Sequence, residues 1–323
     1  MIHTFEIAQF TTSVGVRVEA LRVHYQLYGC ELGSAPVVVI NHAFTGNSQL
    51  TGKDGWWSIA VGDRRLIDTT RFTVVAFNIP GNGYGAGTDE LIFNYQHWTA
   101  VDVARIFNYG ITEVLGLKEV YALVGCSLGG GIAWEMAVLA PALFEQLVII
   151  AADWKATDWI IGNCLLQEQI LKNSNNPLHD ARLHAMLCYR TPQSLKMKFD
   201  RSTHLPTQLY NVESWLLHHG EKLQERFSLS AYKLMNQLIK TIDITRDHDS
   251  FAAAVHDLDS EITLVAIDSD LYFSPQENRD TAEELAALGK SVHYKEIHSV
   301  HGHDAFLIEF RQLERLLRGC FEE

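Results

Sequence analysis

The sequence has few cysteines, and no two of them lie close together. The five, Cys30, Cys126, Cys164, Cys188 and Cys320, are an odd number, widely scattered, and form no C-x-x-C pair. This usage excludes a disulfide framework and a zinc ribbon, and it is typical of reduced thiols. We therefore expect a cytoplasmic protein.

Basic residues and long apolar runs are also scarce. The chain has 26 Lys and Arg against 39 Asp and Glu, a formal net charge of −13. Such a chain is unsuited to neutralising nucleic acid or an anionic membrane, although a local basic pocket remains compatible with it. The N-terminus carries Glu6 where a secretory signal needs a basic start. The uncharged run 120–134 is shorter than the roughly 20 residues that span a bilayer, so neither nucleic acid nor membrane is an expected partner.

Short apolar runs alternate with longer helical patterns along most of the 323 residues, 47% of which are hydrophobic. Continuous apolar runs are typical of parallel strands buried on both faces. These runs are 36–41, 72–78, 121–124, 146–150 and 262–267, and residues 17–28 alternate like one strand of an antiparallel pair. Helical patterns follow near 98–115, 130–139, 275–288 and 304–317. The sequence predicts an α/β protein with a mostly parallel central sheet flanked by helices.

Residues 153–249 interrupt this alternation. The segment is helix-like, polar and rich in histidine, and it is broken at Pro177, Pro192 and Pro206. A helical insertion of this kind is most economically a lid over the carboxyl ends of the strands, where ligands of α/β sheets bind. We predict a core of residues 1–152 and 250–323, with a helical lid at 153–249.

A glycine-rich segment follows one predicted strand and precedes a helix. It reads Gly125-Cys126-Ser127-Leu128-Gly129, a G-x-S-x-G pattern. Small residues two before and two after the serine allow a sharp turn that exposes its hydroxyl at a helix N-terminus, where developing negative charge is favoured. A loop selected only for tight packing would also be rich in glycine. The order of strand, turn and helix favours Ser127 as a nucleophile.

A serine nucleophile needs a general base that is held by a third group. With this type of turn the chain order is serine, acid, histidine. Asp268 and Asp270 both follow a late strand, and their position favours Asp270, although a solvated turn would also favour aspartates. One of His298, His301 and His303 should be the base.

Two further expectations concern the same site. The oxyanion donors should be the backbone N–H of Leu128 and that of Phe44, in the loop 41–46 after a strand. The histidine cluster with Asp304 is also compatible with a metal site, but it lacks the i, i+4 spacing of a zincin and an H-x-H-x-D-H pattern, so no metal is expected.

Several other side chains that could suggest a ligand have simpler explanations. We expect Trp56, Trp57 and Met136 in the core, and His218, His219 and His248 as solvated lid residues.

Taken together, these segments resemble the homoserine O-acetyltransferases, a family of the α/β-hydrolase superfamily, over nearly the whole chain. The motifs lie at 42–46 (HAFTG), 55–57 (GWW), 67–69 (IDT), 78–85 (NIPGNGYG), 125–130 (GCSLGG), 269–273 (SDLYF) and 302–307 (GHDAFL), with lid segments at 181–182, 189–191, 212–216 and 226–227.

The resemblance implies the α/β-hydrolase fold and a triad of Ser127, His303 and Asp270. It implies a ping-pong reaction without a permanently bound cofactor: acetyl-CoA acylates Ser127, and the hydroxyl of homoserine, or of a similar hydroxy amino acid, then attacks the acyl-enzyme, as in methionine biosynthesis. Asp304 is expected to hold the acceptor's ammonium group. A homodimer is implied only by this resemblance.

One departure concerns the acceptor's carboxylate. The family's lid carries an arginine that clamps this group, and in the comparable segment 163–170 Gln167 stands at its place. A neutral amide cannot form a charge-assisted bidentate pair. Either the acceptor differs, or Arg182 or Arg190 substitutes, or the chain is a serine esterase or thioesterase. A binding protein that keeps this scaffold without turnover is the remaining hypothesis.

Overall fold

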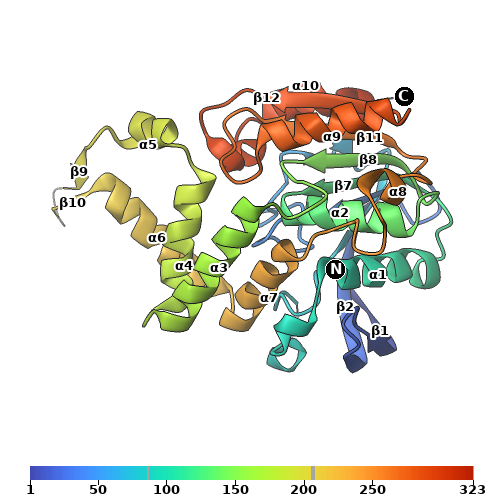
Figure 1. Cartoon of the computed structure of the whole chain (residues 1–323), viewed down its shortest axis with the longest axis horizontal. Helices are drawn as coiled ribbons and strands as arrows, with labels where there is room; N and C mark the ends of the chain where they lie inside the picture. The colour runs from blue at the N-terminus through green and yellow to red at the C-terminus, as the bar shows by residue number, and fades with distance from the viewer. Residues whose placement is uncertain (86, 205–207, 323) are drawn as a thin grey trace.

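The computed structural model describes residues 1–85, 87–204 and 208–322. Its centre is an eight-stranded sheet in the order β1-β2-β6-β3-β7-β8-β11-β12 (Figure 1). β2 pairs antiparallel with β1 and β6, and the pairs from β6 to β12 are parallel. The strands are β1 Ile2–Thr11, β2 Arg17–Gly29, β3 Val37–Asn41, β6 Thr73–Phe77, β7 Val120–Cys126, β8 Phe144–Ile150, β11 Glu261–Ile267 and β12 Val292–Ile297. The predicted mostly parallel sheet and its antiparallel start are confirmed.

Helices account for most of the remaining chain. The α-helices are α1 Ala100–Tyr109, α2 Leu128–Leu139, α3 Asp158–Asn173, α4 Pro177–Tyr189, α5 Pro192–Phe199, α6 Asn211–Arg226, α7 Leu229–Lys240, α8 Phe251–Ala254, α9 Pro275–Ala287 and α10 Phe310–Phe321. The 3₁₀ turns are η1 Thr88–Glu90, η2 Tyr95–His97 and η4 Gly302–Leu307, and η3 Gly110–Val114 is a π-helical turn. None of the helices within the described ranges is both long and apolar enough to cross a membrane.

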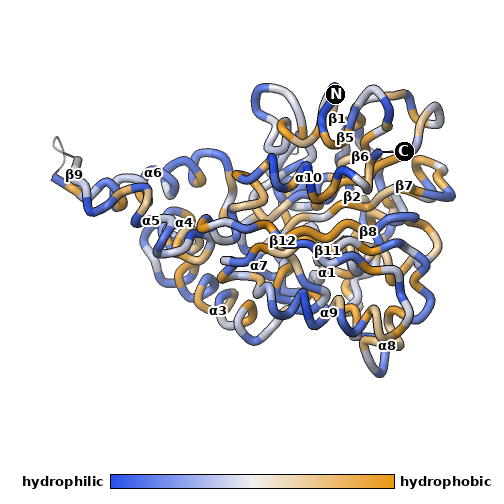
Figure 2. Tube along the Cα trace, turned by 90° about the horizontal axis from the view of Figure 1, so that it is seen from above, coloured by the Kyte–Doolittle hydropathy of each residue, from blue (hydrophilic) through white to orange (hydrophobic). Residues whose placement is uncertain are grey.

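Both faces of the sheet are covered, which explains the continuous apolar runs. Every residue of β3 and of β6 is buried. One face packs against α1, α2 and α9, and the other against α10 and the segment around Trp57. That segment includes the short parallel strands β4 Val61–Gly62 and β5 Ile67–Asp68. Figure 2 shows hydrophobic positions along the central strands.

The predictions for the large apolar side chains are confirmed in this packing. Trp57 and Met136 are fully buried. Trp56 is half-buried, stacks on Trp57 and donates from its indole to the carbonyl of Asn47.

Helices α3 to α7 gather at one end of the sheet, and α5 and α6 extend farthest from it (Figure 1). Pro177 and Pro192 are the first residues of α4 and α5. Proline is tolerated there because an N–H at the first position of a helix has no partner within the helix. The expectation that this region lacks strands is wrong at one place, because β9 Thr203–His204 pairs with β10 Leu209–Tyr210. Pro206 lies outside the described residues.

The predicted helix over 304–317 is wrong at its start. The 3₁₀ turn η4 occupies Gly302–Leu307, and α10 begins only at Phe310. Gly302 has a φ of 67°, and a Cβ at this position would lie 2.8 Å from the carbonyl oxygen of Tyr189. The apolar periodicity of this segment therefore reflects two elements, and the first of them carries His303.

Candidate active site

Ser127 lies in the turn between β7 and α2, at the carboxyl end of a parallel strand. Its φ of 54° is unusual for a residue with a side chain and persists only where the surroundings hold it. Its amide donates to the carbonyl of Ile150. A Cβ at Gly125 would come within 2.3 Å of the carbonyl oxygen of Gly129, and one at Gly129 within 2.5 Å of that of Asn41. Both glycines are thus required by the close packing of the turn.

Three of the predicted side chains form one hydrogen-bonded chain. His303 Nε2 lies 2.9 Å from Ser127 Oγ, and His303 Nδ1 lies 2.7 Å from Asp270 Oδ2. The other oxygen of Asp270 accepts the backbone N–H groups of Tyr272, at 2.7 Å, and Phe273, at 3.0 Å. An ionised Asp270 accepts the Nδ1 proton, which leaves Nε2 free to accept a proton from Ser127. All three side chains are buried.

The other candidate residues have different partners. Asp268 Oδ2 lies 3.1 Å from Nδ1 of His298. Nδ1 of His301 lies 2.9 Å from Ser194 Oγ in α5. The three histidines therefore do not converge, and within residues 1–85, 87–204 and 208–322 no three His, Cys, Asp or Glu side chains are grouped to hold a metal.

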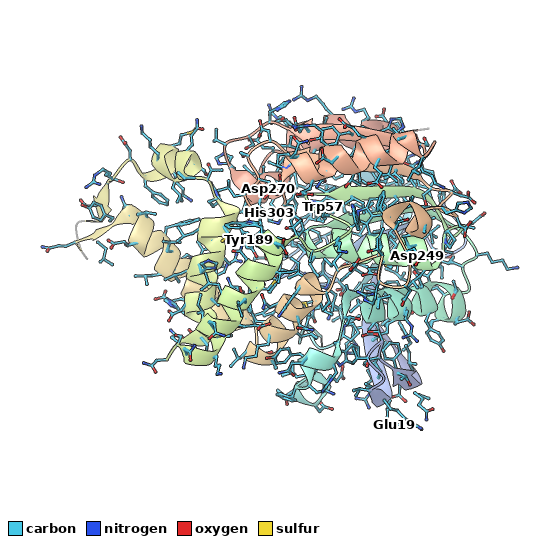
Figure 3. All side chains as sticks on the ribbon, in the orientation of Figure 1. Glu19, Trp57, Tyr189, Asp249, Asp270 and His303 are labelled. Carbon is cyan, nitrogen blue, oxygen red and sulfur yellow. The ribbon has the colours of Figure 1, made fainter. Side chains whose placement is uncertain are left out.

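Aromatic rings surround the imidazole of His303. The ring centroids of Tyr189, Tyr272, Phe273 and Phe306 lie 5.4 to 5.5 Å from that of His303. Burial raises the pKa of both tyrosines, so they remain neutral. Tyr189 belongs to α4, and Figure 3 shows it beside His303 and Asp270. Sequence reasoning missed this enclosure because the rings come from three segments, namely α4, the turn after β11 and η4.

The loop after β3 is held by a buried histidine. His42 Nε2 accepts the N–H of Ile79 at 3.1 Å, so its Nδ1–H donates to the carbonyl of Ala43 at 2.8 Å. Burial lowers the pKa of His42 to about 4 and keeps the ring neutral. The next residue is Phe44. In the described part of the chain, neither its amide nor that of Leu128 has an acceptor within hydrogen-bond distance, so both N–H groups are free to donate.

Charged side chains of α4, of the residue after it and of η4 lie close to the hydrogen-bonded chain. Arg190 Nη1 is 3.8 Å from Asp304 Oδ2. Arg182 Cζ lies 5.8 Å from the ring centroid of Tyr189, and no carboxylate among the described residues forms an ion pair with it. Burial raises the pKa of Asp304, and the positive charges of His303, Arg182 and Arg190 oppose this. A cation without an ion-pair partner and a carboxylate are therefore close neighbours beside His303.

Gln167 is buried and its amide is fully used. Its Nε2 donates to the carbonyl of Ala181 at 3.2 Å and lies 2.9 Å from Nδ1 of His184, while its Oε1 accepts from Tyr232 at 3.3 Å. With Phe44 and other residues it lines a cavity of about 10 Å³, room for one water at most. Gln167 thus ties α3 to α4 and α7 and has no free group for a ligand.

The lid histidines differ from one another. His218 and His248 are exposed, as expected. The expectation that His219 is solvated holds only in part, because the side chain is half-buried and its ring packs at 4.5 Å from that of Trp215. Burial is the first cause that lowers the pKa of His219 to about 4, followed by the positive charge of Arg182 and its neighbours.

Comparisons with known proteins agree with this geometry. The family of the alpha/beta hydrolase fold matches residues 36–309. Homoserine O-acetyltransferase of Chloroherpeton thalassium is 31% identical over 95% of this chain and 85% of its own length. The crystal structure of homoserine O-acetyltransferase from Bacillus anthracis superposes with a TM-score of 0.85 at 19% identity, covering 100% of this chain and 98% of that one. The crystal structure of esterase E22 superposes with a TM-score of 0.87 at 16% identity over the whole of both chains. At such low identities, the structures from Bacillus anthracis and of esterase E22 show the fold alone. The chain belongs to the homoserine O-acetyltransferase family of α/β hydrolases.

Proposed function

We propose that the protein transfers an acetyl group from acetyl-CoA to the hydroxyl of homoserine, or of a similar small hydroxy amino acid. The observation that carries the proposal is the Ser127, His303 and Asp270 chain, with bonds of 2.9 and 2.7 Å, in a member of this family. We assign Ser127 as nucleophile, His303 as base and Asp270 as the orienting acid. No permanently bound cofactor takes part, and acetyl-CoA is a co-substrate.

In the first half-reaction, Ser127 Oγ forms a bond to the thioester carbon while its proton passes to His303 Nε2. The tetrahedral oxyanion is stabilised by the N–H groups of Phe44 and Leu128. The carbon–sulfur bond then breaks, and His303 gives the proton to the leaving thiolate, so that CoA departs as a thiol. Asp270 stabilises the imidazolium that exists between these two proton transfers.

In the second half-reaction, the acceptor hydroxyl attacks the acyl-serine. Its proton passes to His303, and the same proton returns to Ser127 Oγ when the ester bond to the enzyme breaks. We assign Asp304 to the acceptor's ammonium group and Arg182 to its carboxylate, because these opposite charges lie together beside His303. Gln167 takes no part, since its amide is satisfied within the protein.

Residues 153–249 are proposed to act as a lid that decides whether water or an alcohol reaches the acyl-enzyme. Tyr189 of α4 packs on His303 and excludes solvent from one side of the imidazole. A dry site favours transfer over hydrolysis, which is the chemical difference between a transferase and an esterase of this fold. The reaction would serve methionine biosynthesis in the cytoplasm, and a homodimer is expected from the family; gel filtration with light scattering measures the latter.

Release of free thiol from acetyl-CoA tests the proposal. Thiol release should accelerate strongly when homoserine is added and should yield O-acetylhomoserine in equal amount. Release at the same rate with and without homoserine, with acetate as the product, would identify a thioesterase. Screening serine and other hydroxy amino acids as acceptors then identifies the alcohol.

A further inference from the structure

A group of positively charged side chains extends along the lid from the candidate active site to α5. We call Arg190, Lys198, Lys222 and Arg226 the lid cation cluster. Lys222 and Arg226 share one face of α6 with Trp215, because positions separated by 4, 7 and 11 residues lie on the same side of a helix. Lys198 belongs to α5, and Arg190 is the residue after α4. Three separate segments therefore contribute cations to one region.

Contacts with Trp215 bring these segments together. Lys198 Nζ lies 4.9 Å from the centroid of the Trp215 ring system, and Arg190 Cζ lies 5.9 Å from it. The ring of His219 is 4.5 Å from the same centroid. After burial, the charges of Arg182, His218, Lys198 and Lys222 lower the pKa of His219 to about 4. Positive charges from several segments thus act at this point and add to the effect of burial on His219.

Most cations of the cluster have no ion-pair partner among the described residues. In the described part of the chain, Lys198, Lys222 and Arg226 form no ion pair, and Arg190 has only Asp304, at 3.8 Å. Glu225 follows Lys222 by three residues on α6, but among the described residues neither Glu225 nor Glu221 forms an ion pair with a cation of the cluster. A chain with a net charge of −13 therefore leaves a local group of cations uncompensated, and such a group attracts an external anion.

The cluster reaches from the candidate active site outward. Arg226 Nη1 donates to the carbonyl of Thr45 at 2.9 Å, one residue after Phe44. Arg190 contacts Asp304, one residue after His303. The 11 residues from Trp215 to Arg226 span about 16 Å along α6. The cations therefore extend from the candidate active site, at Arg226 and Arg190, to Lys198 beside Trp215.

We propose that the lid cation cluster binds the phosphate groups of the acyl donor, in the adenosine phosphate portion of CoA. The inference rests on the proposed function and adds the position of the donor. A hydroxy amino acid has one carboxylate, which a single guanidinium can satisfy, whereas several cations spread over α5 and α6 suit a ligand with several phosphates. The distance along α6 suits a donor whose thioester and phosphates are separated by a long arm.

Donors with and without phosphate test the inference. Lys198→Gln combined with Lys222→Gln should raise the KM for acetyl-CoA about tenfold and leave kcat unchanged, because two exposed contacts between charges are lost. The KM for S-acetylpantetheine, which has the same thioester and no phosphate, should not change. Lys118→Gln, at an exposed site before β7, is the matched control. Equal effects on both donors, or none on either, would overturn the inference.

Direct binding separates this inference from the proposed function. In calorimetric titrations, wild-type protein should bind CoA and adenosine 3′,5′-bisphosphate more weakly as salt increases, and the double variant should bind both at least fivefold more weakly. CoA binding of this kind without acetylation of Ser127 would refute the proposed function alone. Acetylation by acetyl-CoA with the same KM in the double variant would refute the inference alone. Inorganic phosphate binding as tightly as CoA would also contradict it.

The His219 imidazole reports on the same contact without turnover. Because neighbouring cations contribute to its low pKa, a bound polyanion should raise that pKa. NMR titration of His219 with and without adenosine 3′,5′-bisphosphate measures the change, and His248, which is exposed, is the internal control. A pKa of His219 that does not move on saturation with this ligand would contradict the inference.

Discussion

The two ends of the candidate site differ in how fully their polar groups are satisfied. Around Ser127 the side chains are buried, and His303 and Asp270 have partners at hydrogen-bond distance within the core. In the lid, Arg182, Lys198 and Lys222 form no ion pair with any described residue. Groups that are hydrogen-bonded within the protein are preorganised for chemistry, whereas unpaired charges can bind a ligand of opposite charge. Our proposal therefore assigns the reaction to the core and the choice of donor and acceptor to the lid.

Removing the nucleophile or the base tests the core half of this comparison most severely. Ser127→Ala and His303→Ala should each lower kcat by roughly 10⁴- to 10⁶-fold, because triad members act as a unit. Combining the two changes should cost little more than either alone. Acetyl transfer measured with a sensitive thiol assay gives these ratios, and multiplicative losses would show that the two residues act independently.

Replacing the acid gives a smaller effect. Asp270→Asn should lower kcat by roughly 10³- to 10⁴-fold, because the imidazole loses the acceptor that holds its tautomer. Asp268→Asn is the matched control, since Asp268 pairs with His298 and not with His303, and it should leave kcat nearly unchanged. If Asp268→Asn lowered kcat as much as Asp270→Asn does, the assignment of Asp270 as the acid would be wrong.

Sequence reasoning predicted the core end well because its signals are local. The G-x-S-x-G pattern and the continuous apolar runs each occupy a few neighbouring residues, and the candidate acids and histidines each lie in one short segment after a late strand. The residues alone left open which aspartate meets which histidine, since Asp268 and Asp270 share one turn. Only the three-dimensional pairing separates them, through the bonds from Asp268 to His298 and from Asp270 to His303.

The lid half is tested through the acceptor. Arg182→Gln should raise the KM for homoserine roughly 10- to 100-fold with little change in kcat, because a charge-assisted bond to the carboxylate is lost. The same variant should show a normal KM for an amino alcohol that lacks a carboxylate. Arg315→Gln on α10 is the control for charge removal. An equal rise in KM for both acceptors would mean that Arg182 acts structurally.

The smallest predicted effect is a dependence of the free energy of unfolding on pH. It comes from His42, in the loop that carries Phe44. The folded protein holds the pKa of His42 at about 4, below the usual 6.5, so the unfolded chain binds a proton that the folded one does not. The contribution of His42 to the free energy of unfolding is therefore fully present above pH 6.5 and declines as pH falls toward 4. The decline is roughly 2 kcal/mol between pH 7 and pH 5.

Urea unfolding at several pH values measures this decline. His42→Asn should flatten it, while His248→Asn, at an exposed position, should not. If the free energy of unfolding of His42→Asn declined with pH as steeply as that of the wild type, other groups would cause the pH dependence.

The lid and the segment after β12 were less predictable. Periodicity placed Asp304 of the core within a helix, whereas the 3₁₀ turn that carries His303 interrupts it. His219 was expected in solvent and is half-buried, because it packs against Trp215 one turn earlier in α6. The identity of Gln167 was readable from the sequence, but its engagement with Ala181, His184 and Tyr232 depends on how three helices pack.

The most direct test of the account is the mass of the intact protein after it is mixed with acetyl-CoA in the absence of acceptor. Wild-type protein should gain one acetyl group, which peptide mapping places on Ser127, and homoserine should remove it as O-acetylhomoserine. Ser127→Ala should remain unmodified. An acetyl group on another residue, or turnover of acetyl-CoA by Ser127→Ala at the wild-type rate, would contradict the account.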